Sequence, residues 1–194
     1  MVTKKRHVEK RNVTKHAVKP VQQKAAVTVN VGTENMLWQI VAFIFFVGIC
    51  LLAGAVGSFF TMPSIPTWYE HLNKPFFTPP NWLFAPVWTL LYILMGASAF
   101  LVWKEGWERH EVKSALAWFI VQLSLNMMWS AAFFGMRSPI AGFAFIALLW
   151  PSIAMQITKS YRVSKLAGWL LVPYILWVSY ALLLNFAVML LNPL

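Results

Sequence analysis

The chain has 194 residues, of which 59% are hydrophobic and only 11% are charged, and its formal net charge is +10. This composition excludes an ordinary soluble domain, in which about 25% of the residues are charged. It indicates an integral membrane protein. The positive charge is accounted for by attraction to anionic lipid headgroups, so we expect membrane lipids and no nucleic acid as partners.

The first predicted element is a basic cytoplasmic tail, residues 1–35, that does not fold alone. It carries eight of the 16 Lys and Arg but no aromatic residue and no hydrophobic period. Such a segment cannot bury enough apolar surface to offset the entropy of folding. A transit peptide is the weaker alternative, because the tail is dominated by Lys, lacks Ser and contains Glu9 and Glu34.

Residues 36–194 are predicted to form an all-α integral membrane domain, a bundle of five transmembrane helices. A spanning helix needs about 20 apolar residues, whereas an outer-membrane barrel would need short alternating strands that are missing here. Uncharged stretches of sufficient length are 35–69, 75–103, 114–136, 139–158 and 166–194. We expect the helices at about 36–60, 82–103, 115–135, 139–158 and 167–191.

The first expected helix carries the small residues Gly48, Ala53, Gly54 and Gly57, which we interpret as packing positions. Cys50, the only cysteine, is expected to be another small packing residue.

The segment 61–81 between the first two helices is rich in proline and aromatic residues. Five prolines restrict its backbone, and loops of this length are usually functional or disordered. The interleaved Trp68, Tyr69, Phe76 and Phe77 favour an ordered cap over the outer mouth of the bundle.

Orientation follows from the basic residues, which are retained on the cytoplasmic side during insertion. Of the 16 Lys and Arg, all but Lys74 and Arg137 lie in the tail or in the connections between helices two and three and between helices four and five. The sequence therefore predicts a cytoplasmic amino terminus and an external carboxyl terminus. We expect the bacterial cytoplasmic membrane.

Three of the expected helices carry polar and aromatic faces at similar depth. Residues three or four apart share one face of a helix, and a rise of about 1.5 Å per residue places these faces in the outer half of the membrane. They comprise Trp88 and Tyr92 on the second helix, Trp118, Gln122, Asn126, Trp129 and Phe133 on the third, and Pro173, Trp177, Ala181 and Asn185 on the fifth.

These faces predict a cavity with flat aromatic walls, a few hydrogen-bonding groups and no fixed charge. Such a site suits a large, flat, mostly apolar ligand. The alternative is that the aromatic residues simply fill the bundle while Gln122 and Asn126 form hydrogen bonds between helices. Periodicity alone leaves both interpretations open, although the small Ala181 beside Trp177 favours the cavity.

The spans contain no Asp, Glu, Lys, Arg or His, which argues against proton-driven transport and against a buried imidazole for a metal or haem iron. No paired nucleophile and base is evident. We therefore predict no catalytic residue, no metal ligand and no required cofactor.

Three motifs resemble the TspO/MBR family of tryptophan-rich sensory proteins and translocator proteins. They are WYEHLNKPFFTPPNWLFAPVWTLLYILMG (68–96), QLSLNMMWSAAFFG (122–135) and VPYILWVSYALLLN (172–185). The resemblance implies a five-helix membrane protein, commonly a homodimer, that binds protoporphyrin IX, haem-related tetrapyrroles and, in some members, sterols. It places the ligand pocket beneath the first loop, and the matching positions are Trp68, Trp88, Tyr92, Asn126, Trp129, Trp177 and Ala181.

The resemblance implies sensing, sequestration or transport of a porphyrin, with Trp88 and Trp177 as stacking walls and Asn126 as a polar anchor. Two alternatives remain. One is light-dependent porphyrin breakdown. The other is a sterol- or lipid-binding scaffold that acts through partners, with Ala131 and Gly135 on a dimer face. The carboxyl end, NFAVMLLNPL, lacks the basic residue that closes a sterol motif in animal members.

Overall fold

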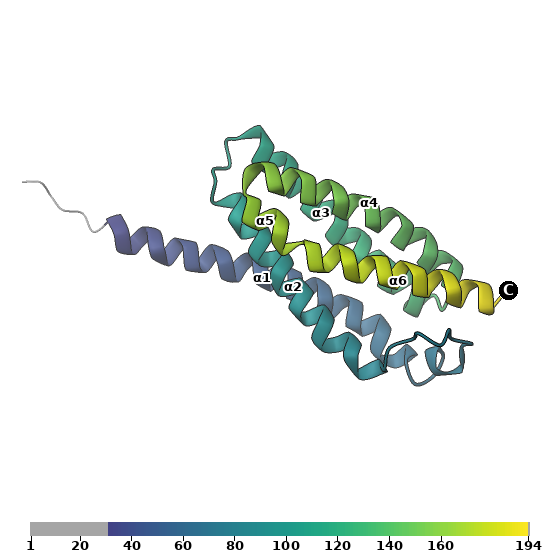
Figure 1. The fold of residues 1–194 in the computed structure, drawn as a ribbon. Coiled ribbons are helices and arrows are strands. Elements are labelled where there is room, and N and C mark those ends of the chain that lie inside the picture. The colour runs from purple at the N-terminus through teal and green to yellow at the C-terminus, as the bar shows by residue number, and fades with distance from the viewer. Residues whose placement is uncertain (1–30, 194) are drawn as a thin grey trace, which may run out of the picture. The chain divides into compact units, whose positions relative to one another are not determined.

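A computed structural model describes residues 31–193, and every regular element in that range is helical. Five stretches are long and apolar enough to cross a membrane, which confirms the predicted all-α architecture of a multi-pass membrane protein. The predicted tail lies outside the described residues as far as residue 30. The main helices are α1 (Val31–Ser64), α2 (Asn81–Trp103), α3 (His110–Ser130), α4 (Pro139–Val163), α5 (Lys165–Leu170) and α6 (Val172–Leu191) (Figure 1).

Helix α1 continues beyond the end predicted for the first span. It passes through Pro63 and ends at Ser64, so the predicted start of the loop at Thr61 is wrong. Hydrogen bonds to the neighbouring helix stabilise this last turn. The Oγ1 of Thr61 lies 2.9 Å from the Oγ of Ser130, and the Oγ of Ser64 donates to the carbonyl of Phe134 at 2.8 Å. The sequence of α1 alone does not reveal these partners.

The last span is broken into α5 and α6 rather than being one continuous helix. Proline has no N–H to donate and ends or kinks a helix at or before its position. Pro173 lies in the first turn of α6, and the preceding Leu171 donates its N–H in a tight turn to the carbonyl of Gly168 at 3.2 Å. The break therefore lies just before α6, which is continuous from Val172 to Leu191.

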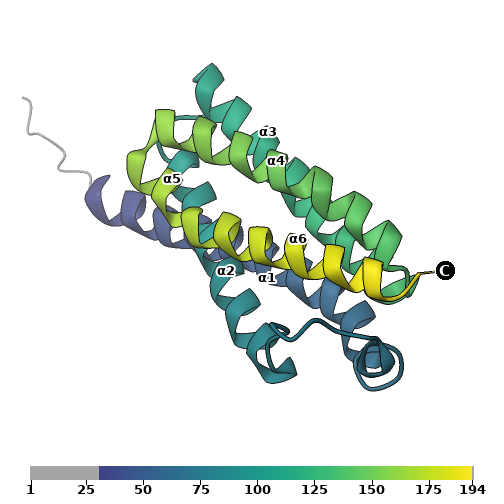
Figure 2. The ribbon, with the colours of Figure 1, turned by 45° about the vertical axis from the view of Figure 1, so that its right-hand side comes forward.

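Helices α3 and α4 lie side by side, as both ribbon views show (Figures 1 and 2). A π-helical turn, Ala131–Gly135, leads from α3 into the reversal at Arg137, whose φ is 54°. The side chain of Ser138 then caps α4 by accepting the N–H of Ala141 at 3.2 Å, and Pro139 follows at the first helical position. These local signals turn the chain back along α3.

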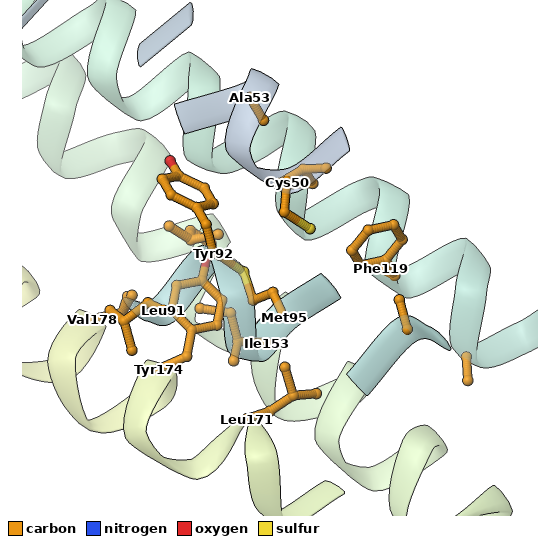
Figure 3. Close-up of a cluster of buried hydrophobic side chains, with 14 of the residues drawn as sticks. Cys50, Ala53, Leu91, Tyr92, Met95, Phe119, Ile153, Leu171, Tyr174 and Val178 are labelled. Carbon is orange, nitrogen blue, oxygen red and sulfur yellow. The ribbon is translucent and has the colours of Figure 1, made fainter. Parts of the chain in front are cut away.

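The core gathers side chains from α1, α2, α3, α4 and α6 (Figure 3). Cys50, Met95, Ile153 and Tyr174 are completely buried there. The burial of Cys50 agrees with its predicted packing role. Helices α1 and α2 approach closely at Gly96, where a Cβ atom would lie 2.5 Å from the Cα of Val47.

The segment between α1 and α2 is an ordered cap that is fastened to α6. The backbone of Asn73 exchanges hydrogen bonds with the Asn192 side chain at 3.0 and 2.9 Å. The hydroxyl of Tyr180 donates to the carbonyl of Phe77 at 2.6 Å. A short 3₁₀-helix, Tyr69–His71, lies within the cap. The cap is therefore fixed on the α6 side of the bundle.

Candidate functional site

A cavity of about 340 Å³ lies between α1, α2 and α3 beneath the cap. This volume falls at the lower end of the range of small-molecule sites, about 300–1,000 Å³. No acidic residue, Lys, Arg or His lines it. Its walls include Gly54, Gly57, Ser58 and Thr61 of α1, Phe84, Trp88 and Tyr92 of α2, Asn126, Trp129 and Ser130 of α3, and Phe134, Ile65 and Tyr69 around the outer end.

The cavity opens sideways between α1 and α2. Ala55, Ser58 and Met62 of α1 line it yet are exposed on the outside of the bundle, and so are Ala85 and Thr89 of α2. Both helices are long and apolar enough to span a membrane, so the opening lies along the membrane-spanning part of the bundle.

The deep wall of the cavity is a layer of aromatic rings. The Trp88 ring centroid lies 5.8 Å from that of Tyr92 and 5.8 Å from that of Trp129, with interplanar angles of 33° and 31°. Trp129 in turn donates its Nε1 hydrogen to the Oδ1 of Asn185 at 3.2 Å. The indole is thus held in place, and the layer presents adjoining flat surfaces to a guest.

A buried hydrogen-bond chain connects this wall to α6. Tyr92 donates its hydroxyl to the Oδ1 of Asn126 at 2.6 Å, and the Nδ2 of Asn126 donates to the hydroxyl of Tyr174 at 3.0 Å. Tyr174 donates to the Oε1 of Gln122 at 2.9 Å. Gln122 and Asn126 thus form the interhelical hydrogen bonds expected by the alternative interpretation, in which side chains fill the bundle. These bonds use one lone pair of the Asn126 Oδ1 and one N–H of its Nδ2, so the amide keeps one further acceptor and one further donor.

Tyr69 closes the cavity from the cap. Its side chain is 4% exposed, and its hydroxyl has no hydrogen-bond partner among residues 31–193. The Nζ of Lys74 lies 4.8 Å from the centroid of its ring. Burial, and secondarily the Tyr180 phenol, raises the pKa of Tyr69 to about 12. The hydroxyl therefore stays protonated at physiological pH and can donate a hydrogen bond.

Comparison with known proteins identifies the family. The sequence profile of the TspO/MBR family matches residues 46–191. The chain belongs to the TspO/MBR family. It is 47% identical over 155 residues to "Tryptophan-rich protein TspO" of Chlorobaculum tepidum, an alignment that covers 80% of this chain and 98% of that one. A protein of the same name from Archaeoglobus fulgidus is 48% identical over 143 residues, covering 73% and 91%. The human "Translocator protein" is 40% identical over 136 residues, covering 69% and 79%.

Four of the seven predicted site residues of this TspO/MBR chain come together in the cavity. Trp88, Tyr92, Asn126 and Trp129 all line it.

The other three predicted residues lie elsewhere. Ala181 lines a separate hollow of about 30 Å³ on the α6 side. Trp68 packs edge-on against Phe133, with ring centroids 5.4 Å apart. Trp177 packs against Phe84 at 6.2 Å and Tyr180 at 5.6 Å.

Helix α1 supplies a cavity wall that the sequence analysis assigned only to packing. Gly54 and Gly57 do pack, because a Cβ atom would lie 2.6 Å from the Tyr92 ring at the first position and 3.5 Å from the Ser130 Oγ at the second. They also line the cavity of the TspO/MBR chain, together with Ser58 and Thr61. These four residues are spaced like one helix face, which was the available signal.

Sequence reasoning also missed Tyr174 on α6. The inward face of α6 was predicted at Pro173, Trp177, Ala181 and Asn185, but Pro173 is exposed and Trp177 is only half-buried. The predicted face is therefore wrong by about one residue in its first two turns. The buried series is Tyr174, Val178, Ala181, Leu184, Asn185 and Val188.

Within the described part of the chain, no group of three His, Cys, Asp or Glu side chains is close enough to hold a metal ion.

Proposed function

We propose that this TspO/MBR protein is a membrane receptor or carrier that binds a flat, mostly apolar molecule between α1, α2 and α3. The ligand class is a porphyrin, such as protoporphyrin IX or a haem-related tetrapyrrole, bound for sensing, sequestration or transport. The observation that carries the proposal is the uncharged cavity whose deep wall is formed by the Tyr92, Trp88 and Trp129 rings.

The chemistry of the cavity supports a planar guest. Aromatic rings prefer offset or tilted stacking against other π-systems, which adds to the gain from burying apolar area. A few polar groups then orient the guest. Tyr69, Ser58, Asn81 and Asn126 can do this. Thr61 and Ser130 contact each other, and both donate to the carbonyl of Gly57.

The sideways opening supports delivery through the membrane. A macrocycle that dissolves poorly in water partitions into the bilayer, where it meets the opening between α1 and α2 directly. The same opening lets polar substituents of the guest remain near the headgroups while the ring enters the cavity. Relatives named "Translocator protein" and "Tryptophan-rich sensory protein" fit a role in moving or sensing such a guest.

Titration with protoporphyrin IX tests the proposal. The full-length protein in lipid nanodiscs should show saturable quenching of tryptophan fluorescence. Trp88→Ala should weaken the affinity about tenfold, because one stacking surface is lost. The matched control is Trp150→Ala, since this exposed indole lies on α4 and donates to the Oγ of Ser179. Quenching that does not saturate, or equal affinities for both variants, would contradict the proposal.

Further properties of the chain are part of the same proposal. The basic residues favour a cytoplasmic amino terminus in a bacterial cytoplasmic membrane, and family membership favours a homodimer. Sterols are a second ligand class. Light-dependent breakdown of the bound porphyrin is the alternative activity, and an unchanged porphyrin spectrum after hours of illumination would exclude it.

A further inference from the structure

The cap has an apolar tip, formed by Phe76 and Phe77 shortly before the start of α2. Phe76 is completely exposed, and its ring lies edge-on to that of Phe77 with centroids 5.5 Å apart. Removing such a ring from water is favourable. The surroundings of the tip therefore affect how firmly the cap is held.

Hydrogen bonds at two levels place the segment 73–77 along α6. Asn73 is bonded to Asn192, just beyond the end of α6. Phe77 accepts the hydroxyl of Tyr180 at 2.6 Å. Because Tyr180 precedes Leu191 by eleven residues, it lies about 16 Å along the helix from that end. The segment therefore descends along α6, and its apolar tip lies nearer the middle of the span than Asn73 does.

The surface of α6 beside the tip is apolar and exposed. Leu176, Leu183 and Leu190 recur every seven residues, so they share one face of the helix, and they are 62–64% exposed. Tyr180 lies next to this face. Helix α6 belongs to a stretch that is long and apolar enough to cross a membrane. The tip is thus continuous with an exposed apolar surface of a membrane span.

The backbone of the tip has few polar groups left to pair. Pro75, Pro79 and Pro80 have no N–H, so residues 75–80 carry only three backbone donors. One of them, the N–H of Thr78, donates to the carbonyl of Pro75 at 3.0 Å. Irregular backbone is costly next to acyl chains because its unpaired N–H and C=O groups lack water. The prolines and these bonds lower that cost.

The charged side chains of the cap lie on the other side of the tip, toward the short 3₁₀-helix. Glu70 is exposed there, and the Nζ of Lys74 donates to the carbonyls of Tyr69 and Glu70 at 2.7 and 2.9 Å. No Asp, Glu, Lys, Arg or His occurs in residues 75–103. A polar part followed by an aromatic, uncharged tip is typical of a segment at the boundary between headgroups and acyl chains.

We propose that Phe76 and Phe77 form a lipid-contacting surface, inserted among the acyl chains just below the headgroups of the leaflet on the cap side. The bilayer then holds the cap together with Asn192 and Tyr180. This inference goes beyond the proposed function, because it does not depend on which molecule occupies the cavity.

Spin labels on the full-length protein in phosphatidylcholine nanodiscs test the depth of the tip. Cys50 is completely buried, so the unmodified protein serves as the labelling blank. The labelled variants are Phe76→Cys, Leu183→Cys on the exposed face of α6, and Glu70→Cys on the polar part of the cap. Each nitroxide is exposed to O₂, which concentrates among acyl chains, and to a water-soluble nickel chelate, which is excluded from them.

The ratio of the O₂ to the chelate collision rate reports the surroundings of each label. At position 76 we expect a ratio within about twofold of that at position 183 and at least about fivefold above that at position 70, because polar solutes are excluded from hydrocarbon. A ratio at position 76 equal to that at position 70 would place the tip in water and overturn the inference. Protection from both reagents would mean that protein, such as a second copy of the chain, covers the tip, and would equally overturn it.

Hydrogen exchange provides a second measurement without a label. Phe76→Asp should make exchange of residues 70–80 in nanodiscs about tenfold faster, because the gain from burying one phenylalanine ring is lost. Phe76→Leu keeps an apolar side chain and should exchange nearly as slowly as the unmodified protein. Glu70→Gln is the matched control on the polar part of the cap. Equal exchange in the Phe76→Asp and Phe76→Leu variants would show that the tip is not in lipid.

Discussion

The two sides of the bundle are held together by different means. On the side of α3, α4 and α6, buried polar side chains connect the helices: Tyr174 is bonded to Gln122 and Asn126, and Asn185 connects Trp129 to the carbonyl of Pro139. On the side of α1, small residues pack against α2, with Gly54 against Tyr92 and Val47 against Gly96. Near the outer end, Thr61 and Ser64 form hydrogen bonds to α3 and the π-helical turn that follows it.

This difference shows how a membrane bundle can combine a fixed frame with room for a guest. In lipid, helix association depends on close packing and hydrogen bonds rather than on a hydrophobic driving force. The α3–α4–α6 side uses both throughout. On the α1–α2 side close packing leaves a cavity, and exposed lining residues of both helices, such as Ser58 and Thr89, mark its opening. Three substitutions test this contrast.

The largest expected effect comes from Gly96→Ala, where α2 approaches the backbone of α1 closely. The added Cβ would lie 2.5 Å from the Cα of Val47 and 2.8 Å from its N atom, so backbone rather than a flexible side chain must move. Overpacking of this kind costs about 1–3 kcal/mol. Unfolding in SDS, followed by circular dichroism, should show a loss of that size, with weaker ligand binding because the α1 wall shifts.

Gly48→Ala is the control for that measurement. No heavy atom lies within 4 Å of a Cβ built at Gly48. Because alanine favours helix over glycine, this variant should be neutral or more stable by up to about 1 kcal/mol. Equal destabilisation by both substitutions would mean that α1 and α2 do not meet at Gly96.

A smaller effect is expected from Tyr174→Phe in the α3–α4–α6 frame. The change removes a hydroxyl that accepts from Asn126 and donates to Gln122 in a fully buried site. Unsatisfied polar groups remain, and the loss should be about 1–2 kcal/mol. Tyr161→Phe is the matched control, because that side chain is exposed on α4 and should tolerate the change. Equal stability of the two variants would show that the buried chain contributes nothing.

The smallest effect is expected from Ser64→Ala, which removes the donor to the Phe134 carbonyl at the end of α1. One interhelical hydrogen bond in a membrane protein contributes about 0.6 kcal/mol on average. Ser58→Ala, at an exposed position of the same helix, should leave the SDS unfolding curve unchanged. A loss larger than that of Tyr174→Phe would reverse the proposed order, making the α1 attachment the stronger one.

The sequence predicted the inward-facing residues of the third helix better than those of the last helix. The spacing of Gln122, Asn126 and Phe133 predicted an inward face, and all three are buried, whereas Trp118 and Trp129 of the same stripe are half-buried. On α6 the same reasoning chose Pro173 and missed Tyr174, although both lie in one continuous helix. With 3.6 residues per turn, a step of four residues turns about 40° beyond a full revolution, so a face extended only in steps of four drifts around the helix.

Length, apolarity and charge distribution by themselves determined that this chain forms five membrane helices with a proline-rich cap, because lipid leaves the backbone no other way to satisfy its hydrogen bonds. The aromatic motifs also indicated which faces would meet around a ligand. Only the tertiary structure decided that α1 rather than α6 forms the open wall of the cavity. That outcome depends on how closely helices approach one another, and that distance is decided by pairs of residues far apart in the sequence.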